Sequence, residues 1–175
     1  MSKRWIQLIC AVVLVASLSL GPSHILAQGE DLPTILMGEF FFSVPGGSQA
    51  AFPPPDAPPQ NILTISGAAD GEIAFIVENI GAILHEIRSP LFMATKEVKA
   101  AIFDAAGNLV AESEGTDLLE LELGAGFKAE VQITLAGAVA KSLAADPNLT
   151  MTFELSCHVE GHYPAGMRAL ITVAP

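Results

Sequence analysis

Alternating apolar and polar residues dominate the chain from residue 61 onward. Leu alternates with Glu in 117–126, and apolar residues again occupy every second position in 127–135. This period of two predicts strands with one buried and one wet face. Shorter β-type runs bounded by glycine occur at 61–67 and 71–81. Two more apolar runs close the chain, so the pattern predicts many short strands.

Other segments complete the outline of the fold. The apolar and aromatic run 34–44 predicts a first strand, and 97–113 predicts two strands joined by a Gly-Asn turn. The run 136–147 is the one convincing helical piece, and it ends at Pro147. The segment 45–60 is dense in Pro and Gly and predicts an irregular insertion. Many strands with little helix predict an antiparallel sandwich or barrel.

The N-terminus has the pattern of an export signal. Lys3 and Arg4 precede an almost unbroken apolar run, 6–20. This run is short for a membrane span and is typical of a signal peptide. We therefore expect an exported protein, periplasmic or extracellular.

Ala27 offers a cleavage point before Gln28. Cleavage there divides the chain into a signal peptide, 1–27, and a single domain, 28–175, which includes the Pro-rich insertion. Ile25 is larger than the residue that the cleavage enzyme prefers, so an uncleaved N-terminal anchor is the alternative.

Composition narrows the class of protein. The chain has 175 residues, of which 51% are hydrophobic and 15% charged, so it can bury a real core. Its net charge of −11 makes nucleic acid a poor partner, since phosphates require Lys and Arg. The acidic surface favours a partner protein with a basic docking patch. We expect the protein to be a monomer.

Removal of the signal leaves one cysteine, because Cys10 lies in the apolar run and Cys157 near the C-terminus. A lone cysteine in an exported protein is free, paired between chains or bound to something. Cys157 begins the segment `CHVEGHYPAGM`, in which His162 and Met167 follow at C-x4-H-x4-M spacing. His85 lies far upstream. Two imidazoles, a thiolate and a weak axial thioether are the ligands of a type 1 copper centre.

These residues resemble the cupredoxin family, the small blue-copper proteins related to azurin, plastocyanin, auracyanin and rusticyanin. The similar features are `ENIGAILHE`, `CHVEGHYPAGM` and the closing `RALITV`, and the resemblance covers 61–175. It implies an all-β, antiparallel Greek-key sandwich with one short helix. It also implies one type 1 copper per chain. The equatorial ligands would be His85, Cys157 and His162, and the axial ligand would be Met167.

The family further implies that the edge of His162 is partly exposed as the electron port. Pro164, Ala165 and Gly166 would then form part of an apolar rim on which a redox partner docks.

The sequence offers other possible donors, His158 and Met93, and zinc is another possible metal. His158 directly follows Cys157, so on an extended chain it points to the opposite face. Met93 is better explained as packing. Zinc accepts one Cys and two His, but Met167 argues against it because a thioether offers zinc little. Each proposed ligand, taken singly, is also explained as an ordinary core residue.

The residues around the predicted ligands give weaker evidence about the site. Asn79 and Gly81 resemble the N-x-G segment that precedes the first ligand in relatives, where the Asn braces the loop; a plain turn is an equal alternative. Glu86 and Arg88 alternate out of the predicted core, and we expect them to be solvated.

The first functional hypothesis is an exported mononuclear type 1 copper protein that carries electrons by Cu(II)/Cu(I) cycling. No Ser-His-Asp set, nucleotide loop or second metal site is evident, so we expect no enzyme activity. The alternative is a periplasmic copper-binding protein for copper handling or resistance. A third hypothesis is an interaction module with a vestigial site. The implied partner is a redox protein, with membrane contact only if the N-terminal segment is uncleaved.

Overall fold

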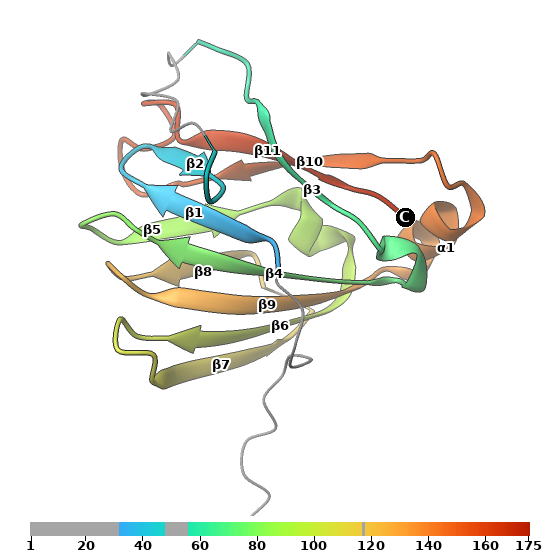
Figure 1. Cartoon of the computed structure of the whole chain (residues 1–175), viewed down its shortest axis with the longest axis horizontal. Helices are drawn as coiled ribbons and strands as arrows, with labels where there is room; N and C mark the ends of the chain where they lie inside the picture. Colours follow the sequence, from blue (N-terminus) through green and yellow to red (C-terminus); the bar gives the residue numbers. More distant parts are fainter. Residues whose placement is uncertain (1–31, 48–55, 117) are drawn as a thin grey trace, which may run out of the picture.

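Two β-sheets face each other across an apolar core (Figure 1). The computed structural model describes residues 32–47, 56–116 and 118–175. The predicted signal peptide, 1–27, and residues 48–55 of the Pro-rich insertion lie outside the described residues. No helix in the described part of the chain is long and apolar enough to cross a membrane.

The first sheet has six strands, in the spatial order β2 (Phe41–Ser43), β1 (Thr34–Gly38), β4 (Glu72–Asn79), β9 (Lys128–Leu135), β6 (Thr95–Phe103) and β7 (Leu109–Gly115). The second sheet has five strands, in the order β3 (Asn61–Ile65), β11 (Arg168–Val173), β10 (Met151–Ser156), β5 (His85–Arg88) and β8 (Glu120–Leu123). The predicted sandwich is therefore confirmed.

Both sheets are mixed, which corrects the expectation of a purely antiparallel sandwich. β1 pairs with β4 in parallel, and β3 pairs with β11 in parallel; the remaining pairs are antiparallel. The physical reason is the path of the chain, because it leaves the first sheet after β2, forms β3 in the second sheet and then returns as β4. Such a crossover lets two strands of one sheet run in the same direction, which a tight hairpin cannot do.

The run 34–44 forms a hairpin, not the single predicted strand. β1 ends at Gly38 and β2 begins at Phe41, so Glu39 and Phe40 form a tight turn. Phe40 has a φ of 64°, and no other non-glycine residue in the described part has a positive φ. A Cβ on Gly38 would lie 2.1 Å from the Phe41 ring, so any other residue there would require this ring to move. This turn becomes important at the metal centre.

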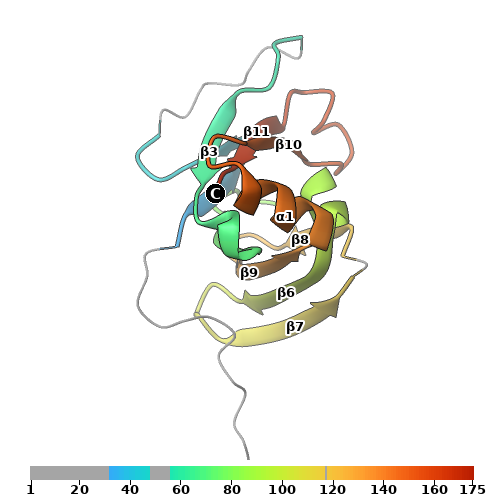
Figure 2. The ribbon, with the colours of Figure 1, turned by 90° about the vertical axis from the view of Figure 1, so that its right-hand side faces the viewer.

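The α-helix α1 (Gly137–Ala145) confirms the predicted helix. It stops before Pro147, since the residue preceding a proline disfavours helical backbone. Two short 3-10 helices, η1 (Ala68–Asp70) and η2 (Pro90–Ala94), complete the elements. α1 closes one end of the sandwich (Figures 1 and 2). β4 and β10 both end at the opposite end, which we call the site end.

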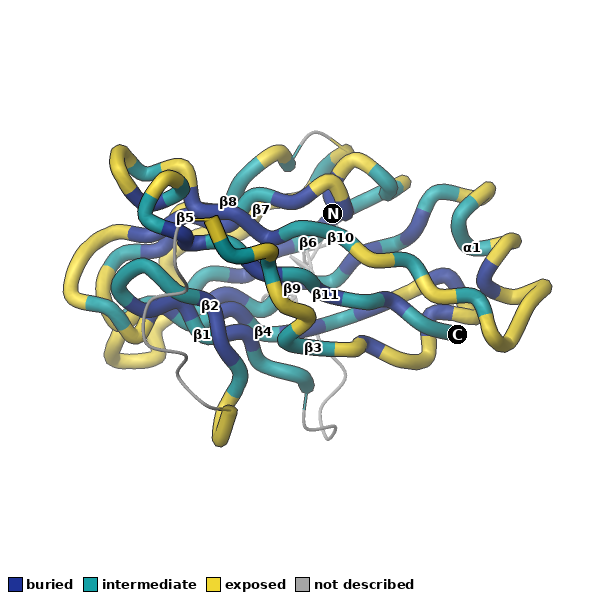
Figure 3. The backbone as a smooth tube through the Cα atoms, turned by 90° about the horizontal axis from the view of Figure 1, so that it is seen from above, coloured by how far each residue is buried: buried dark blue, intermediate teal, exposed yellow. Residues whose placement is uncertain are grey.

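Burial follows the predicted alternation. In β4 and β9 every second side chain is buried, and these side chains face the core between the sheets. In Figure 3 the buried segments run through the middle of the molecule and the exposed segments gather at the loops of both ends. The site end is the part of the molecule where buried polar residues meet: Asn79, His85 and His162.

Candidate metal centre

Three strand ends bring the predicted ligands together. His85 is the first residue of β5, Cys157 directly follows β10, and Met167 directly precedes β11. These strands are neighbours in the second sheet, because Ser156 pairs with Arg88 on one side and with Arg168 on the other. Residues 72 positions apart in the sequence therefore meet through ordinary sheet pairing.

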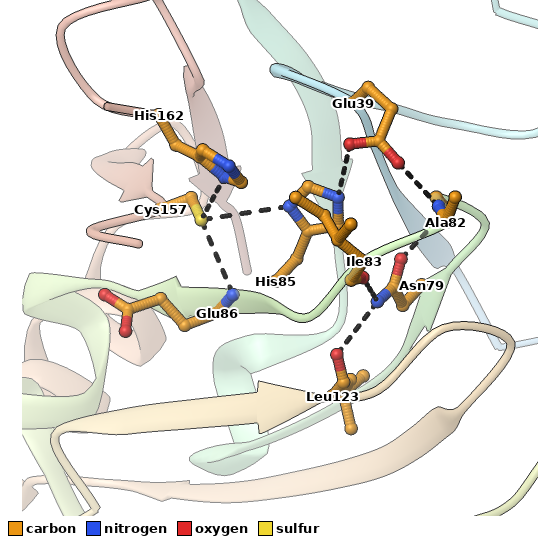
Figure 4. Close-up of polar contacts among 10 residues, drawn as sticks. Glu39, Asn79, Ala82, Ile83, His85, Glu86, Leu123, Cys157 and His162 are labelled. Atoms are coloured by element: carbon orange, nitrogen blue, oxygen red, sulfur yellow. Dashed lines mark hydrogen bonds and ion pairs between the residues drawn. The ribbon is translucent and has the colours of Figure 1, made fainter. Parts of the chain in front are cut away.

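The donor atoms of His85, Cys157 and His162 lie within 4.8 Å of one another (Figure 4). The sulfur of Cys157 is 3.3 Å from Nδ1 of His162 and 4.0 Å from Nδ1 of His85. In a trigonal plane with metal–nitrogen and metal–sulfur bonds of ~2.0 and ~2.3 Å, nitrogen and sulfur lie about 3.7 Å apart. The two distances bracket this value, so the donor set fits one metal ion.

All of these side chains are withdrawn from water. Cys157, His85 and Met167 are fully buried, and His162 is 3% exposed. Met167 is tied to two of the others through its backbone: its N–H donates to the carbonyl of His162 at 3.0 Å, and its carbonyl accepts from the N–H of Cys157 at 3.2 Å. A Cys, two His and a Met are thus gathered in one buried group, which is compatible with one type 1 copper.

The loop 157–167 holds its shape through its own backbone. His162 N–H donates to Val159, and Ala165 N–H donates to Gly161. Gly161 and Gly166 have φ values of 84° and 99°, a region that glycine adopts without strain. The glycines of the sequence motif therefore serve to fold three donors into a single tight loop.

Burial sets the protonation of the donors. Burial raises the pKa of the Cys157 thiol, although N–H groups of Glu86 and Val159 oppose this effect. The N–H of Glu86 lies 3.5 Å from the sulfur. Burial also lowers the pKa of His85, while the carboxylate of Glu39 raises it. The metal-free site thus favours a thiol and a neutral imidazole, and a metal ion must displace the thiol proton.

Asn79 braces the loop that leads to His85, and the bracing interpretation holds over the plain turn. Its side-chain N–H groups donate to the carbonyls of Ile83 and Leu123, both at 2.8 Å, and its side-chain oxygen accepts from Gly81 N–H at 2.9 Å. Asn79 is fully buried. One amide at the end of β4 therefore holds the loop 80–84 and ties it to the end of β8.

The β1–β2 turn adds two residues that the sequence analysis missed. The carboxylate of Glu39 accepts from Ala82 N–H and lies 3.4 Å from Nε2 of His85. The ring of Phe40 meets His162 edge to face, with ring centroids 4.9 Å apart. One signal was present in the sequence, since Glu39 is the single charged residue of the apolar run 34–44.

Phe40 also explains a wrong expectation. His162 was expected to expose its edge as the electron port, yet only 3% of it is exposed. The imidazole is covered because Phe40 packs against it from the β1–β2 turn. Exposed apolar side chains next to the ligands belong instead to the loop before His85, and they include Ile80, Ile83 and Leu84.

The residues set aside as ligands lie outside the group. His158 is exposed, and its Nε2 lies 3.0 Å from the Ser156 hydroxyl. Met93 is 76% exposed on η2, so it is surface and not the predicted packing residue.

Glu86 corrects a further prediction, because it is 5% exposed and not solvated. Its carboxylate accepts from the N–H of His158 at 2.7 Å and pairs with Arg88 at 3.0 Å. Arg88 also pairs with Glu120. Strand alternation predicted the wrong exposure for Glu86 because the chain after Cys157 covers this face of β5.

Comparison with known proteins bears on the fold. No protein-family model and no curated protein sequence matches the chain. Among solved structures, a multicopper oxidase from Campylobacter jejuni, a metallo-oxidase, matches with a TM-score of 0.51 and 10% identity over 86% of this chain. The fold is cupredoxin-like. The match covers 32% of the oxidase, so the chain spans about a third of its length.

Two other matches have lower TM-scores. A multicopper oxidase from Pseudomonas thermotolerans is 18% identical, with a TM-score of 0.49, over 87% of this chain and 32% of its own. Auracyanin from Roseiflexus castenholzii is 17% identical, with a TM-score of 0.38, over 81% of this chain and 95% of its own.

The expectation that the protein is not an enzyme is contradicted. The Campylobacter jejuni structure that matches with a TM-score of 0.51 is a multicopper oxidase, and oxidases are enzymes. The cupredoxin-like fold therefore occurs in catalytic proteins, and the absence of a familiar catalytic motif was too weak a ground for that expectation.

Proposed function

We propose that this cupredoxin-like chain is a type 1 copper protein that accepts and releases single electrons. The residues that would hold the copper are His85, Cys157, His162 and Met167. The observation that carries the proposal is the buried cluster in which Nδ1 of each imidazole faces the Cys157 sulfur, at 4.0 and 3.3 Å. When bound, copper supplies a one-electron couple between Cu(II) and Cu(I).

The chain's own residues perform three tasks in this function. Cys157, His85 and Met167 lie at the ends of three strands that are already paired, and His162 is held in the loop by backbone hydrogen bonds, so the ligands need little movement. Burial of the donors excludes water from the site. The N–H of Glu86 points at the sulfur and favours the thiolate that a metal requires. A rigid, dry donor set keeps reorganisation small when an electron arrives or leaves.

Burial also favours electron transfer over the alternative of copper handling. An ion that is handed to another protein must be reached by that protein's ligands. Here Cys157 and His85 are fully buried and His162 nearly so. Such a site suits an ion that stays in place.

The test is a titration of the protein with one equivalent of Cu(II), followed by visible absorption and EPR. We expect an intense thiolate-to-copper band and a narrow copper hyperfine splitting. Cys157→Ser should abolish the band and leave the fold intact. His158→Ala is the matched control, because it alters the neighbouring, exposed imidazole, and it should keep the band. A colourless wild-type complex would contradict the proposal and favour copper handling.

The partner that we propose is a redox protein that docks at the site end. Ile80, Ile83 and Leu84 expose apolar surface there, each between 44% and 47% exposed. They immediately precede His85, and the carboxylate of Glu39 lies beside them. With a net charge of −11, the chain favours a partner whose apolar contact is rimmed by basic residues. Association should then weaken as salt is raised.

Export remains our proposal for localisation, and it rests on the basic and apolar pattern of the first 27 residues. Mass spectrometry of protein from the periplasm or medium tests it. A mature N-terminus at Gln28 would support cleavage, whereas an intact N-terminus in the membrane fraction would support the anchor.

A further inference from the structure

Glu39 reaches the metal centre from the opposite sheet. It lies in the turn between β1 and β2, whereas His85 begins β5 of the second sheet. Its two carboxylate oxygens divide their contacts: Oε1 accepts from the N–H of Ala82, and Oε2 lies 3.4 Å from Nε2 of His85 (Figure 4). The carboxylate thus joins the β1–β2 turn to the loop 80–84 and to an imidazole.

The carboxylate of Glu39 is the group available to satisfy Nε2 of His85. The imidazole is fully buried, and its Nδ1 faces the sulfur of Cys157. Nε2 makes no well-aligned hydrogen bond in the described part of the chain, and Glu39 is the charged group that it faces. A buried ring nitrogen without a partner is costly, so the nearby carboxylate is the natural acceptor for an Nε2–H.

Gly81 provides the room for this contact. A Cβ at Gly81 would lie 2.6 Å from Nε2 of His85 and 2.9 Å from Oε1 of Glu39. Any other residue would therefore push the carboxylate and the imidazole apart. The backbone N–H of Gly81 is held by Asn79, which keeps this gap in place. The contact is thus built into the loop.

We propose that Glu39 is a positioning residue of the metal centre, with two effects on His85. It holds the neutral ring as the Nε2–H tautomer, which leaves the Nδ1 lone pair directed at the sulfur. Its negative charge also favours Cu(II) over Cu(I) and lowers the reduction potential of the site. The second effect rests on the proposed copper function, whereas the first is a property of the metal-free protein.

The physical basis is general to metal sites. A ligand imidazole that donates its other N–H to a carboxylate has a fixed tautomer, a fixed ring orientation and greater basicity. Here the carboxylate is 39% exposed, so solvent weakens its field without removing it. A charge this close to a ligand should change the Cu(II)/Cu(I) equilibrium about tenfold, which corresponds to ~59 mV for a one-electron couple.

Three variants separate the effects. Glu39→Gln keeps an acceptor oxygen and removes the charge, whereas Glu39→Ala removes both. Glu97→Gln is the matched control: Glu97 is 38% exposed, pairs with Lys99, and lies near the start of β6, at the end of the sheet away from the centre. Reduction potentials would be measured on the copper-loaded proteins, and long-range 1H–15N NMR spectra would give the His85 tautomer in the metal-free proteins.

We expect the potential to rise by ~59 mV in Glu39→Gln and Glu39→Ala, which is a tenfold change in the Cu(II)/Cu(I) equilibrium, whereas Glu97→Gln should change this equilibrium less than about twofold. We expect the Nε2–H tautomer in the wild type and in Glu39→Gln, and a mixture of tautomers in Glu39→Ala. Wild-type potential and tautomer in Glu39→Ala would overturn the proposal. If wild-type protein lacks the thiolate band, the copper function fails instead, and the metal-free tautomer still decides the role of Glu39.

Discussion

Two short segments meet at the metal centre, and they contribute in different ways. The loop 157–167 carries three of the four donor residues within eleven positions of the sequence. The β1–β2 turn carries no proposed ligand, yet Glu39 contacts one imidazole and Phe40 the other. The loop supplies the chemistry of the site, and the turn supplies its surroundings. A ligand set can therefore be local in sequence while its environment is not.

The largest expected effect concerns the ligand loop and is a pH dependence of copper affinity. Burial raises the pKa of the Cys157 thiol, so copper must displace a proton at neutral pH, and lower pH opposes binding. Release of one proton predicts an affinity that rises about tenfold per pH unit while the thiol remains protonated. Competition titrations with a copper chelator at pH 6, 7 and 8 measure this slope. A flat profile would show that the thiol is not displaced.

A second experiment tests the Asn79 brace of the loop 80–84, the loop that Glu39 of the turn contacts. Asn79→Ala removes the three hydrogen bonds of a fully buried side chain and leaves carbonyls of Ile83 and Leu123 without this partner. We expect the free energy of unfolding to fall by about 2–4 kcal/mol in denaturant titrations.

The matched control for Asn79→Ala is Asn108→Ala. Asn108 also donates from its side chain, to Asp104, but it is exposed to solvent. Its replacement should cost less than about 1 kcal/mol. Equal losses in the two variants would mean that burial of the Asn79 amide has no special importance.

A third experiment tests the backbone of the β1–β2 turn. Phe40→Gly and Phe40→Ala both remove the ring that covers His162, but only glycine adopts a φ of 64° without strain. We expect Phe40→Gly to be more stable than Phe40→Ala by about 1 kcal/mol, measured by chemical unfolding. At Phe41, in the adjoining strand, the order should reverse, since glycine weakens a strand. Alanine more stable at both positions would contradict the turn geometry.

The smallest expected effect concerns a turn that the sequence did specify. Asp104 accepts hydrogen bonds from Asn108 and from the N–H of Ala106, and these bonds lower its pKa. A carboxylate with a depressed pKa contributes stability above its unfolded pKa, and this contribution is lost as pH falls through its folded pKa. The difference in melting temperature between wild type and Asp104→Asn should therefore be small at pH 7 and shrink further as the pH is lowered in the acid range. A difference that grows in acid would reverse the sign.

The turns at Gly107 and at Glu39 show which turns the sequence could and could not predict. The turn at Gly107 was predicted because Gly and Asn follow a short apolar run, and Gly107 has a φ of 84°. The turn at Glu39 was missed because a phenylalanine occupies its left-handed position, which sequence preferences disfavour. Tertiary packing of Phe40 on His162 offsets that local cost. The run 34–44 was therefore predicted as one strand although it folds as a hairpin.

The environment of the ligands was equally hidden from the sequence. Alternation predicted that Glu86 faces water, but the backbone of His158 crosses that face and its N–H donates to the Glu86 carboxylate. The family resemblance predicted that the edge of His162 is exposed. Its burial depends instead on the β1–β2 hairpin, which places Phe40 against the imidazole. Neither contact leaves a periodic signal, because each joins residues more than seventy positions apart.

The sequence by itself determined the strands, the helix and the clustering of Cys157, His162 and Met167, because each depends on residues within a few positions of one another. The tertiary structure alone decided the parallel pairings, the cover over His162 and the carboxylate beside His85. These features depend on which strand ends meet, and that is set by the packing of two sheets around a common core. Residues close together in the sequence identify most of the proposed donors, whereas the packing of the two sheets decides which side chains surround them.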